Sequence, residues 1–523
     1  MPTMRDMVAE LEARRTRVRG MGGADKVAKQ HARGKMTARE RLAVLFDDGV
    51  FFEVGAHGTQ MGLAAGPDGT DKPPADAVVT AFGKIEGRMA CCAAYDFTVK
   101  GGSIGYTGEE KVTRLRAMAL RGRWPMVWLI DSAGARIDPA SAHPDSLALF
   151  AGTGHLFREQ VAMSGVVPQV AAILGPGAAG TAYIPGLADY VPMVKDVASL
   201  ALGGPPLVKA VTGQDVGEQE LGGSKVHCEV SGVGDGEFDN DEACLVAVKK
   251  YLSFFPSHCD EPPPDKPSDD PVDRREERLL DLLPESARKP YDMYELVRAI
   301  VDHGEIFDVK PRFARSVITC LARIGGKSVG IVADQPMHLG GILDNDSADK
   351  AARFIQICDA FQVPLVFLQD VPGFMVGSKV EHAGIIRHGA KMLHVMAAAT
   401  VPKLTVVVRK AYGAGYYVMC GRAYEPDLIV CWPTAEISVM GAEGMLGIAS
   451  KKLFGEQAPS PEMKKAVLDQ IQKGIDVYRV AGWGLVDDVI DPRDTRRVLA
   501  WGLELAQHKR VERPARKRGV IPV

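Results

Sequence analysis

Two short runs of small residues are the places where this sequence could hold a reacting anion. The first is GPGAAG at residues 175–180, and the second is AYGAGYY at residues 411–417. Each run follows an apolar, strand-like segment and precedes a helix-like one. A turn without bulky side chains leaves backbone N–H groups exposed at a helix N-terminus, where the helix dipole adds partial positive charge. A pair of such groups can bind an anion or stabilise a developing oxyanion, although a small-residue turn can also serve packing alone.

Two other functions are compatible with these glycines. Residues 175–180 match the dinucleotide fingerprint G-x-G-x-x-G, but Asp189 and Asp196 lack the preceding strand that would make either of them the ribose-binding acid. Residues 101–105, GGSIG, match the nucleophile elbow G-x-S-x-G and would make Ser103 an acyl-transfer nucleophile. Asp131 and His155 could complete a triad, but their spacing does not select them. A Ser103 hydrolase therefore stays the rival hypothesis.

The same kinds of element position both runs, because the two halves of the chain resemble each other. Residues 109–134 align with residues 348–373 when the sequence is shifted by 239 positions. The shift pairs Lys111 with Lys350, Pro125 with Pro364, Leu129 with Leu368, Asp131 with Asp370, and Gly134 with Gly373. In each half an amphipathic helix leads through Pro into a short apolar strand closed by Asp. The pattern predicts two domains of one α/β fold, each with its own exposed turn.

Composition predicts the remaining organisation. The chain has 523 residues, too many for one core, and a segment rich in Pro and Asp at residues 256–277 is typical of a linker. We therefore expect a domain over residues 1–255, a linker over 256–284 and a domain over 285–523. A capping box formed by Thr37 and Glu40 predicts a helix start near the N-terminus.

Charge and cysteine usage exclude several classes of function. A net charge of −3 provides no field for nucleic acid, and the absence of a run of about 18 apolar residues argues against a membrane span. The nine cysteines are scattered without CxxC spacing, which argues against a zinc ribbon and favours reduced thiols in a cytoplasm. No metal site is expected in this chain.

Several long motifs resemble the carboxyltransferase (β) subunits of biotin-dependent acyl-CoA carboxylases, the family of propionyl-CoA and methylcrotonyl-CoA carboxylases. The motifs are GKMTARERLAVLFDDG (34–49), DSAGARI (131–137), DVPGFMVG (370–377), GIIRHGAKML (384–393) and WPTAEISVMG (432–441). The resemblance implies two tandem crotonase-like domains of the ClpP/crotonase superfamily. It places the active site between the first domain of one subunit and the second domain of another, in a homo-oligomer that is commonly a hexamer. It also implies a partner α subunit that carries the biotin carboxylase and biotin carboxyl carrier domains.

The resemblance further implies the chemistry. Carboxybiotin on the partner subunit gives up CO2, the biotin nitrogen takes the α-proton of an acyl-CoA, and the resulting thioester enolate attacks CO2. Two oxyanions are formed, so two N–H sites are needed and no side-chain base is required. By motif matching, Ala179 and Gly180 stabilise the acyl-CoA enolate, and Ala414 and Gly415 hold the biotin carbonyl. The substrate-binding positions implied are Gly101, Gly102, Ser103, Ala133, Gly134, Tyr183 and Tyr417. The biotin-binding positions implied are Pro372, Gly373, Phe374, Tyr412, Gly413 and Tyr416.

Two positions depart from the family pattern. Ala179 stands where the family often has Gly, and its methyl group narrows the pocket without removing an N–H donor. Tyr417 stands where propionyl-type enzymes tend to have Asp, and a Tyr there favours a larger or branched acyl chain. Residues 419–424, MCGRAY, are similar to the methylcrotonyl branch, whereas RKAY and WPTAEI are similar to the propionyl branch. The acyl group is therefore left open, as is the choice between a carboxylase and a decarboxylase or transcarboxylase.

Overall fold

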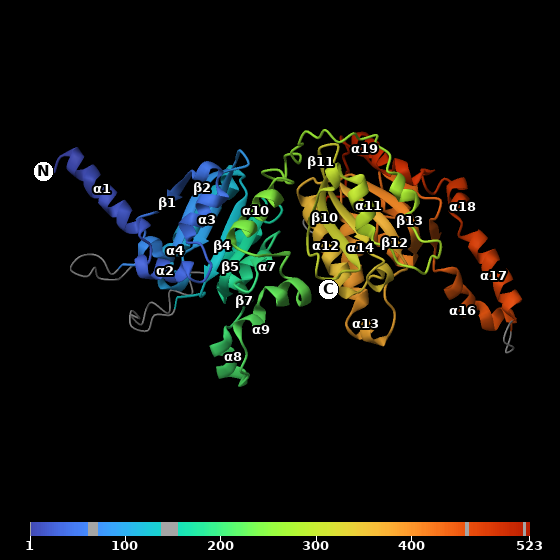
Figure 1. The fold of residues 1–523 in the computed structure, drawn as a ribbon, viewed down its shortest axis with the longest axis horizontal. Coiled ribbons are helices and arrows are strands. Elements are labelled where there is room, and N and C mark those ends of the chain that lie inside the picture. Colours follow the sequence, from blue (N-terminus) through green and yellow to red (C-terminus); the bar gives the residue numbers. More distant parts are fainter. Residues whose placement is uncertain (1, 61–71, 137–154, 455–459, 516–518, 523) are drawn as a thin grey trace. The chain divides into compact units, whose positions relative to one another are not determined.

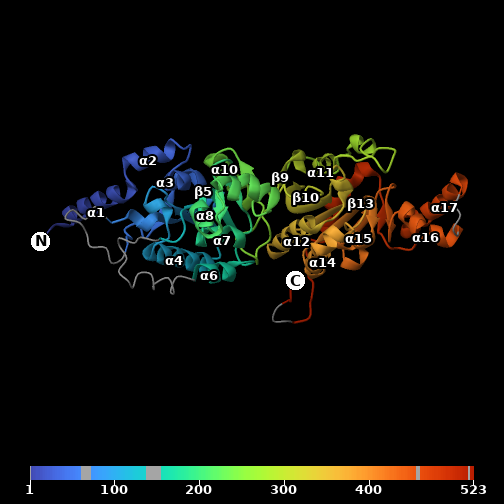
Figure 2. The same ribbon diagram turned by 90° about the horizontal axis from the view of Figure 1, so that it is seen from below.

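The computed structural model describes residues 2–60, 72–136, 155–454, 460–515 and 519–522. Its contacts divide the chain into two compact units, Met1–Pro262 and Pro263–Val523. The division falls inside the segment rich in Pro and Asp. Each unit is a mostly parallel sheet with helices on both faces (Figure 1; Figure 2).

The sheet of the first unit has the strand order β1-β2-β3-β4-β5-β6-β8, and β7 pairs with β5 beside this path. The pairs β1–β2 and β2–β3 are antiparallel, and the pairs from β3 onward are parallel. The strands are β1 Phe51–Val54, β2 Val78–Ile85, β3 Arg88–Tyr95, β4 Met126–Ser132, β5 Gln169–Ala178, β6 Pro192–Val194, β7 Ser199–Ala201 and β8 Gly236–Phe238. β4 is buried along its whole length, as expected for a parallel strand covered on both faces.

Helices cover both faces of this sheet. The helices of the first unit are α1 Met4–Arg19, α2 Ala24–His31, α3 Ala38–Leu45, α4 Tyr106–Gly122, α6 His155–Met163, α7 Gly180–Leu187, α8 Pro205–Thr212, α9 Glu218–Gly222 and α10 Asp241–Leu252; α1 and α8 bury no residue. α3 and α10 lie on one face, and α4, α6 and α7 lie on the other (Figure 2). The predicted capping box is confirmed, because Thr37 accepts from the Glu40 N–H and the Glu40 carboxylate accepts from the Thr37 N–H.

The second unit repeats the first, strand by strand. Its order is β16-β14-β13-β12-β11-β10-β9, with β15 paired to β13, so each strand has the same neighbours as its counterpart. The strands are β9 Ile306–Asp308, β10 Val317–Ile324, β11 Lys327–Asp334, β12 Leu365–Val371, β13 Lys403–Tyr412, β14 Leu428–Cys431, β15 Glu436–Ser438 and β16 Asp488–Val489. The predicted duplication of one α/β fold is therefore confirmed.

The helices of the second unit also lie on two faces. They are α11 Met293–Ile300, α12 Asn345–Ala360, α13 Ser378–His382, α14 Ile385–Ala398, α15 Gly413–Val418, α16 Ala442–Phe454, α17 Pro461–Gly474, α18 Val477–Gly482 and α19 Thr495–Leu505. The main core packs α11 and α19 against the sheet through Leu296, Ile300, Leu499 and Leu503. α12 and α14 cover the opposite face, and α16 and α17 project from the unit as a hairpin (Figure 1; Figure 2).

Each sheet has one irregularity between its two central strands. The register of β4 against β5 shifts between Ile130 and Ser132, and that of β12 against β13 shifts between Gln369 and Val371. Beyond the shift, β5 leaves β6 and pairs with β7, and β13 leaves β14 and pairs with β15. The last residues of each long strand are thus held by a different neighbour from the rest of the strand.

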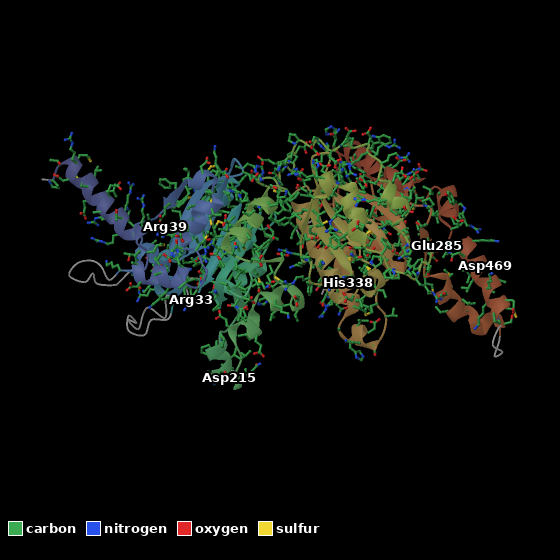
Figure 3. All side chains as sticks on the ribbon, viewed as in Figure 1. Arg33, Arg39, Asp215, Glu285, His338 and Asp469 are labelled. Carbon is green, nitrogen blue, oxygen red and sulfur yellow. The ribbon has the colours of Figure 1, made fainter. Side chains whose placement is uncertain are left out.

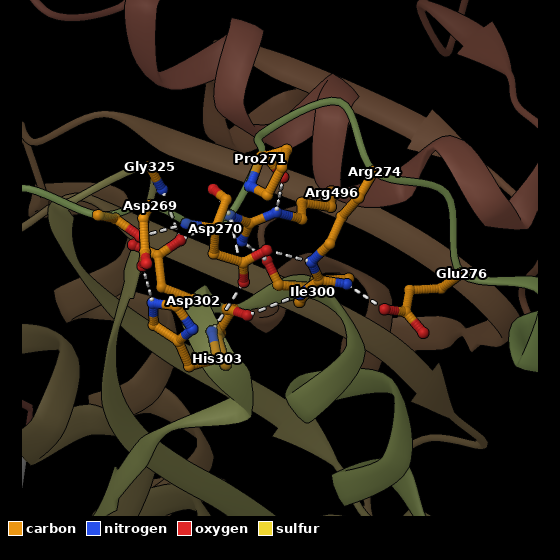
Figure 4. A network of polar contacts seen from close by, with 12 residues as sticks. Asp269, Asp270, Pro271, Arg274, Glu276, Ile300, Asp302, His303, Gly325 and Arg496 are labelled. Carbon is orange, nitrogen blue, oxygen red and sulfur yellow. Dashed lines mark hydrogen bonds and ion pairs between the residues drawn. The ribbon is translucent and has the colours of Figure 1, made fainter.

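Part of the segment expected to be a linker, around residues 270–276, is bound to the second unit by hydrogen bonds and ion pairs. Arg496 of α19 donates to the carbonyl oxygens of Asp270 and Pro271, and it pairs with Asp302 at 2.7 Å (Figure 4). Arg274 of the same segment pairs with Asp270 at 2.6 Å, and its Nη2 donates to the Val301 carbonyl at 3.0 Å. Across the described residues, no helix has the length and apolarity needed to cross a membrane.

Candidate functional site

The first small-residue run is only partly a turn. β5 continues through Ala178, so Gly175 and Gly177 lie within the strand, and the turn consists of Ala179 at the start of α7. Ala179 has a φ of +52°, a left-handed value that is uncommon for a residue with a side chain. The dinucleotide hypothesis loses its basis here, because that fingerprint needs its first glycines in the turn itself.

The N–H groups of this turn are not equivalent. The Ala179 N–H donates to the carbonyl of Ala201 in β7 at 3.2 Å. Gly180 is the first residue of α7, so its N–H has no acceptor within the helix, and no side chain caps α7. This differs from the sequence-based expectation of two exposed N–H groups. The turn presents Gly180 as its donor, and Ala179 fixes the direction of the turn.

Five other predicted positions of the first unit lie in two segments that meet beside this turn. Gly134 has a φ of +89°, and a Cβ there would lie 2.6 Å from the Ala178 carbonyl oxygen. The Gly134 carbonyl accepts from the Ile104 N–H at 2.8 Å, and the Ala133 N–H donates to the Gly101 carbonyl at 2.9 Å. The loop that contains Gly101, Gly102 and Ser103 is therefore joined to the end of β4 beside the turn. Glycine is required at Gly134 because a side chain would clash with the turn.

Ser103 is held as a structural residue of this loop. Its hydroxyl donates to the Lys100 carbonyl at 2.8 Å and accepts from Arg136 Nε at 3.1 Å. Arg136 also pairs with the buried Asp76. A guanidinium cannot act as a base, and no imidazole among the described residues hydrogen-bonds Ser103. His155 contacts Arg158 instead. The described part of the chain therefore gives Ser103 no general base for the hydrolase hypothesis.

Tyr183 lies on α7, three residues after Gly180. Its side chain is half exposed and contacts the Phe157 ring edge to face at 5.6 Å between ring centroids. Phe157 also lies near Gly180, since a Cβ on Gly180 would be 3.9 Å from both Phe157 and Ile104. The side of this turn that faces α6 is thus apolar.

The second turn lies at the equivalent place in the second unit. β13 ends at Tyr412, α15 begins at Gly413 with a φ of +56°, and no side chain caps this helix. Ala414 and Gly415 belong to its first turn, so their N–H groups have no acceptor within the helix. A Cβ on Gly415 would lie 2.7 Å from the Val371 side chain and 3.2 Å from Gly373 Cα. The turn therefore packs tightly against the end of β12.

The end of β12 carries the other predicted biotin positions. Gly373, which follows Pro372, has a φ of +124°, and its carbonyl accepts from the Leu343 N–H at 3.1 Å. The Phe374 ring packs against Gly389 of α14, where a Cβ would lie 3.2 Å from the ring. The structure thus brings the residues after β12 together with the turn after β13.

The three tyrosines near this turn differ in their contacts. Tyr412 is buried and its hydroxyl pairs with Glu436 of β15; burial and that carboxylate raise the pKa of the phenol. The Tyr416 hydroxyl accepts from the Arg422 N–H at 2.9 Å, and its ring packs against a core cluster. Tyr417 is 46% exposed and stacks on Tyr424 with 6.2 Å between ring centroids. Of the three, only Tyr417 presents its ring at the surface.

Sequence reasoning missed the charged side chains that lie behind both turns. Asp370 was used only to set the register of the repeat, and Asp131 was considered beyond that only as a possible triad acid, yet both are fully buried and ion-paired. The sequence did contain a sign of these ion pairs, in the strands β5 and β13. When the two units are aligned by their strand pairing, Gly175 of β5 corresponds to Arg409 of β13. A glycine that corresponds to an arginine inside a buried strand indicates that a buried charge is neutralised there in two different ways.

Two duplicated α/β units, each with an uncapped helix directly after a buried parallel strand, define a protein of the crotonase fold class. The chain belongs to the carboxyl transferase family, since the profile of the carboxyl transferase domain matches residues 29–521. It is a carboxyltransferase.

Similar proteins have related functions. The methylmalonyl-CoA decarboxylase subunit alpha of Veillonella parvula is 41% identical over 523 residues and covers 100% of both chains. The carboxyltransferase subunit of propionyl-CoA carboxylase from Haloferax mediterranei is 40% identical over 523 residues, again with 100% of both chains covered. A crystal structure of the transcarboxylase 12S hexamer with methylmalonyl-CoA and methylmalonic acid bound superposes with a TM-score of 0.94 and 42% identity. That match covers 100% of this chain and 99% of the other.

Proposed function

We propose that this chain is the carboxyltransferase (β) subunit of a biotin-dependent acyl-CoA carboxylase, and that it transfers a carboxyl group from carboxybiotin on a partner subunit to an acyl-CoA. The observation that carries this proposal is the pair of uncapped helix starts, at Gly180 and at Ala414–Gly415, in equivalent places of two repeated units. In the proposed reaction, negative charge develops on the thioester oxygen of the acyl-CoA and on the ureido oxygen of biotin. Two groups of backbone N–H donors are therefore needed, one for each oxygen.

On the acyl-CoA side, the Gly180 N–H is the donor to the thioester oxygen. Ala179 keeps the turn in its left-handed conformation, because its own N–H is bound to Ala201. The loop of Gly101, Gly102 and Ser103 and the adjoining Ala133 and Gly134 form the wall that receives the substrate. Tyr183 and Phe157 make the neighbouring surface apolar, which suits an acyl chain.

On the biotin side, the N–H groups of Ala414 and Gly415 are the donors to the ureido carbonyl. Gly373, Gly413 and Gly415 lack side chains, so a planar carbonyl group can approach the backbone closely. Pro372, Phe374, Tyr412 and Tyr416 form the walls around these glycines. Carboxybiotin supplies the CO2 when its N–C bond breaks and provides the nitrogen that takes the α-proton, so the new C–C bond forms without a side-chain base.

The assembly follows the family. We expect a homo-oligomer, commonly a hexamer, in which the acyl-CoA turn of one subunit faces the biotin turn of another. The transcarboxylase 12S structure is itself a hexamer. The partner is a biotinylated α subunit with biotin carboxylase and biotin carboxyl carrier domains.

A second direction of the reaction is favoured by one observation. A relative that is 41% identical over the whole chain is a methylmalonyl-CoA decarboxylase subunit. The same two turns serve removal of the carboxyl group from a substrate such as methylmalonyl-CoA and its transfer to biotin. Backbone donors stabilise the same enolate in both directions, so the geometry does not set the direction.

The test is carboxylation by the purified chain with biotin-loaded α subunits, ATP and ¹⁴C-bicarbonate across acetyl-, propionyl-, butyryl-, methylcrotonyl- and long-chain acyl-CoA. Incorporation of label into one acyl-CoA is the expected result. Biotin-dependent CO2 release from methylmalonyl-CoA without incorporation from bicarbonate would identify the decarboxylase. Thioester hydrolysis without biotin, abolished by Ser103→Ala, would overturn both.

A further inference from the structure

The irregularity in each sheet coincides with a buried aspartate. Asp131 lies between Ile130 and Ser132 in β4, and Asp370 lies between Gln369 and Val371 in β12. Both side chains are 0% exposed. Burial of a carboxylate costs free energy unless cations or N–H donors surround it. The partners of each aspartate therefore show which parts of the fold it connects.

In the first unit the partners come from the N-terminal segment. Asp131 Oδ1 pairs with Lys35 Nζ at 2.6 Å, and Oδ2 pairs with Arg41 Nη1 at 2.9 Å and accepts from Gln30 Nε2 at 2.9 Å. Arg41 also donates to the carbonyl of Leu174, a residue of β5 within the irregular stretch, at 3.0 Å. The carboxylate, the cation and the neighbouring strand form one buried unit.

α3, which carries Arg41, is fastened from two more sides. Arg41 Nε pairs with Asp241 of α10 at 2.7 Å. Arg39, on the same helix (Figure 3), pairs with Glu53 of β1 at 2.8 Å. These two ion pairs hold α3 in place, and with it the Arg41 guanidinium that pairs with Asp131.

In the second unit the cation comes from the neighbouring strand itself. Arg409 of β13 pairs with Asp370 Oδ2 through Nε at 3.0 Å and Nη2 at 2.9 Å. Asp370 Oδ1 accepts from the Lys410 N–H at 3.2 Å. Arg409 is held in turn by the Lys289 carbonyl and by the face of the Tyr291 ring. Asp370 thus binds both the side chain and the backbone of the irregular stretch.

The first unit has no room for an arginine at the strand position that Arg409 occupies in the second unit. The residue of β5 that corresponds to Arg409 is Gly175. A Cβ there would lie 2.0 Å from Asp131 Oδ1 and 2.6 Å from Lys35 Nζ. In the first unit, position 175 must be glycine because Lys35 and Arg41 of the N-terminal segment occupy the space beside Asp131. In the second unit, the equivalent position is Arg409, which itself pairs with Asp370. Both units neutralise the equivalent carboxylate against the same stretch of the same strand.

We propose that Asp131 and Asp370 are positioning residues, and that each fixes the irregular stretch of its neighbouring strand and thereby the direction in which the following turn presents its N–H groups. The assignment of the turns to acyl-CoA and biotin rests on the proposed function. The stretch at Gly175 leads within a few residues to Ala179, and the stretch at Arg409 leads to Gly413. Irregularities of this kind bend a strand and re-aim its end, and they are frequent beside active sites.

The proposal is tested by amide hydrogen exchange of the full chain with Asp131→Asn or Asp370→Asn, which keep the shape of the side chain and remove its charge. Asp131→Asn is expected to speed exchange in residues 177–183 by about tenfold or more while residues 411–418 keep their rates. Asp370→Asn is expected to do the reverse. Lys35→Met, which leaves Arg41 in place, serves as a milder variant of the first clamp should Asp131→Asn fail to fold.

Two matched controls remove buried charges elsewhere. Glu109→Gln breaks the 2.6 Å pair with Arg116 in the first unit, and Asp302→Asn breaks the 2.7 Å pair with Arg496 in the second (Figure 4). Both are expected to lower stability without faster exchange at either turn. Unchanged exchange at the adjacent turn in the folded Asn variants, or an equal rise at both turns, would overturn the proposal.

A catalytic readout separates this inference from the proposed function. Asp131→Asn is expected to lower kcat for carboxyl transfer by about 10²-fold with little change in KM, because a small misplacement of an oriented group is costly. Release of CO2 from the carboxylated carrier without acyl-CoA is expected to fall only in Asp370→Asn. If the unaltered chain transfers no carboxyl group, the proposed function fails, and the exchange rates still decide whether the aspartates hold the turns.

Discussion

Lys111 and Lys350 occupy equivalent positions in the two units, and the Nζ atom of each donates to backbone carbonyl groups. Lys111 Nζ donates to the carbonyls of Ala75 and Val78 at 2.8 and 2.7 Å. Lys350 Nζ donates to those of Phe313 and Val317 at 2.8 and 2.6 Å. In both units these carbonyls flank the start of a strand, β2 or β10. The repeat is therefore preserved in buried polar contacts as well as in the order of strands and helices.

The burial of Lys350 predicts a pH-dependent stability. Burial lowers its pKa to about 7 in the folded chain, against about 10.4 in an unfolded one. Folding therefore favours the neutral amine, and this contribution to stability is complete above about pH 10.4, declines as the pH falls, and is lost once the pH passes about 7. Lys350→Met is expected to flatten this dependence, seen as a Tm difference from the unaltered chain that changes between pH 7 and 10.

The same variant should also be less stable at high pH, where the contribution of Lys350 is complete. Methionine leaves the Phe313 and Val317 carbonyls without their donor, at a cost of roughly 1–3 kcal/mol for each buried group. A Tm difference that stays constant from pH 7 to 10 would show that Lys350 titrates normally in the folded chain.

Gly180→Pro is expected to reduce the rate of carboxyl transfer by about 10²–10³-fold, because it deletes the N–H donor of the first turn while the first position of a helix tolerates proline. Gly180→Ala is the matched control. It keeps the donor, and its Cβ would meet Ile104 and Phe157 only at 3.9 Å. Steady-state kinetics on both variants, with Tm as a check of folding, distinguish the donor from the shape of the turn. Equal activity of the two variants would refute the role of the N–H group.

Gly415→Ala is expected to displace the second turn, since the added Cβ would lie 2.7 Å from the Val371 side chain. Overpacking of this kind costs roughly 1–3 kcal/mol in stability. The misplaced donors should lower kcat by roughly 10²-fold. Gly482→Ala, in α18 with open space around it, is the control and should leave both quantities unchanged. Normal kcat in Gly415→Ala, despite a lower Tm, would argue against this turn as a catalytic element.

Tyr417 is expected to influence which acyl-CoA is used. Its exposed ring, stacked on Tyr424, is replaced by a small side chain in Tyr417→Ala. The ratio of kcat/KM values between two acyl-CoA substrates of different length should then change by about tenfold, the scale of a methylene-sized change in a pocket. Competition between propionyl-CoA and methylcrotonyl-CoA measures this ratio directly. An unchanged ratio would place Tyr417 outside the acyl pocket.

Much of the fold could be predicted because its signals are local. The helix, Pro, strand and Asp pattern around Asp131 and Asp370 defined two equivalent units, and a capping box at Thr37 marked the start of α3. The motifs were sufficient to indicate the family. The turn after β13 was also placed correctly, because glycines shortly after an apolar, β-branched run mark the end of a strand.

The remainder depended on contacts between residues far apart in the chain. The strand β5 continues through two glycines because Ser199–Ala201 pairs with its last residues, and the same pairing occupies the Ala179 N–H. The strand β7 is only three residues long and has no strong sequence pattern of its own. The cations that neutralise Asp131 lie in the N-terminal segment, about 90 residues away, and no local rule connects them.

The different cations behind the two turns have a consequence for how a duplicated gene can diverge. Once one copy draws its positive charge from Lys35 and Arg41, the strand position at Gly175 no longer needs to carry it, whereas Arg409 must remain in the other copy. A substitution at Gly175, Lys35 or Arg41 therefore alters the neutralisation of Asp131 and leaves the pair of Asp370 with Arg409 in place. Under the proposed function, this independence would let the acyl-CoA turn change while the biotin turn stays as it is.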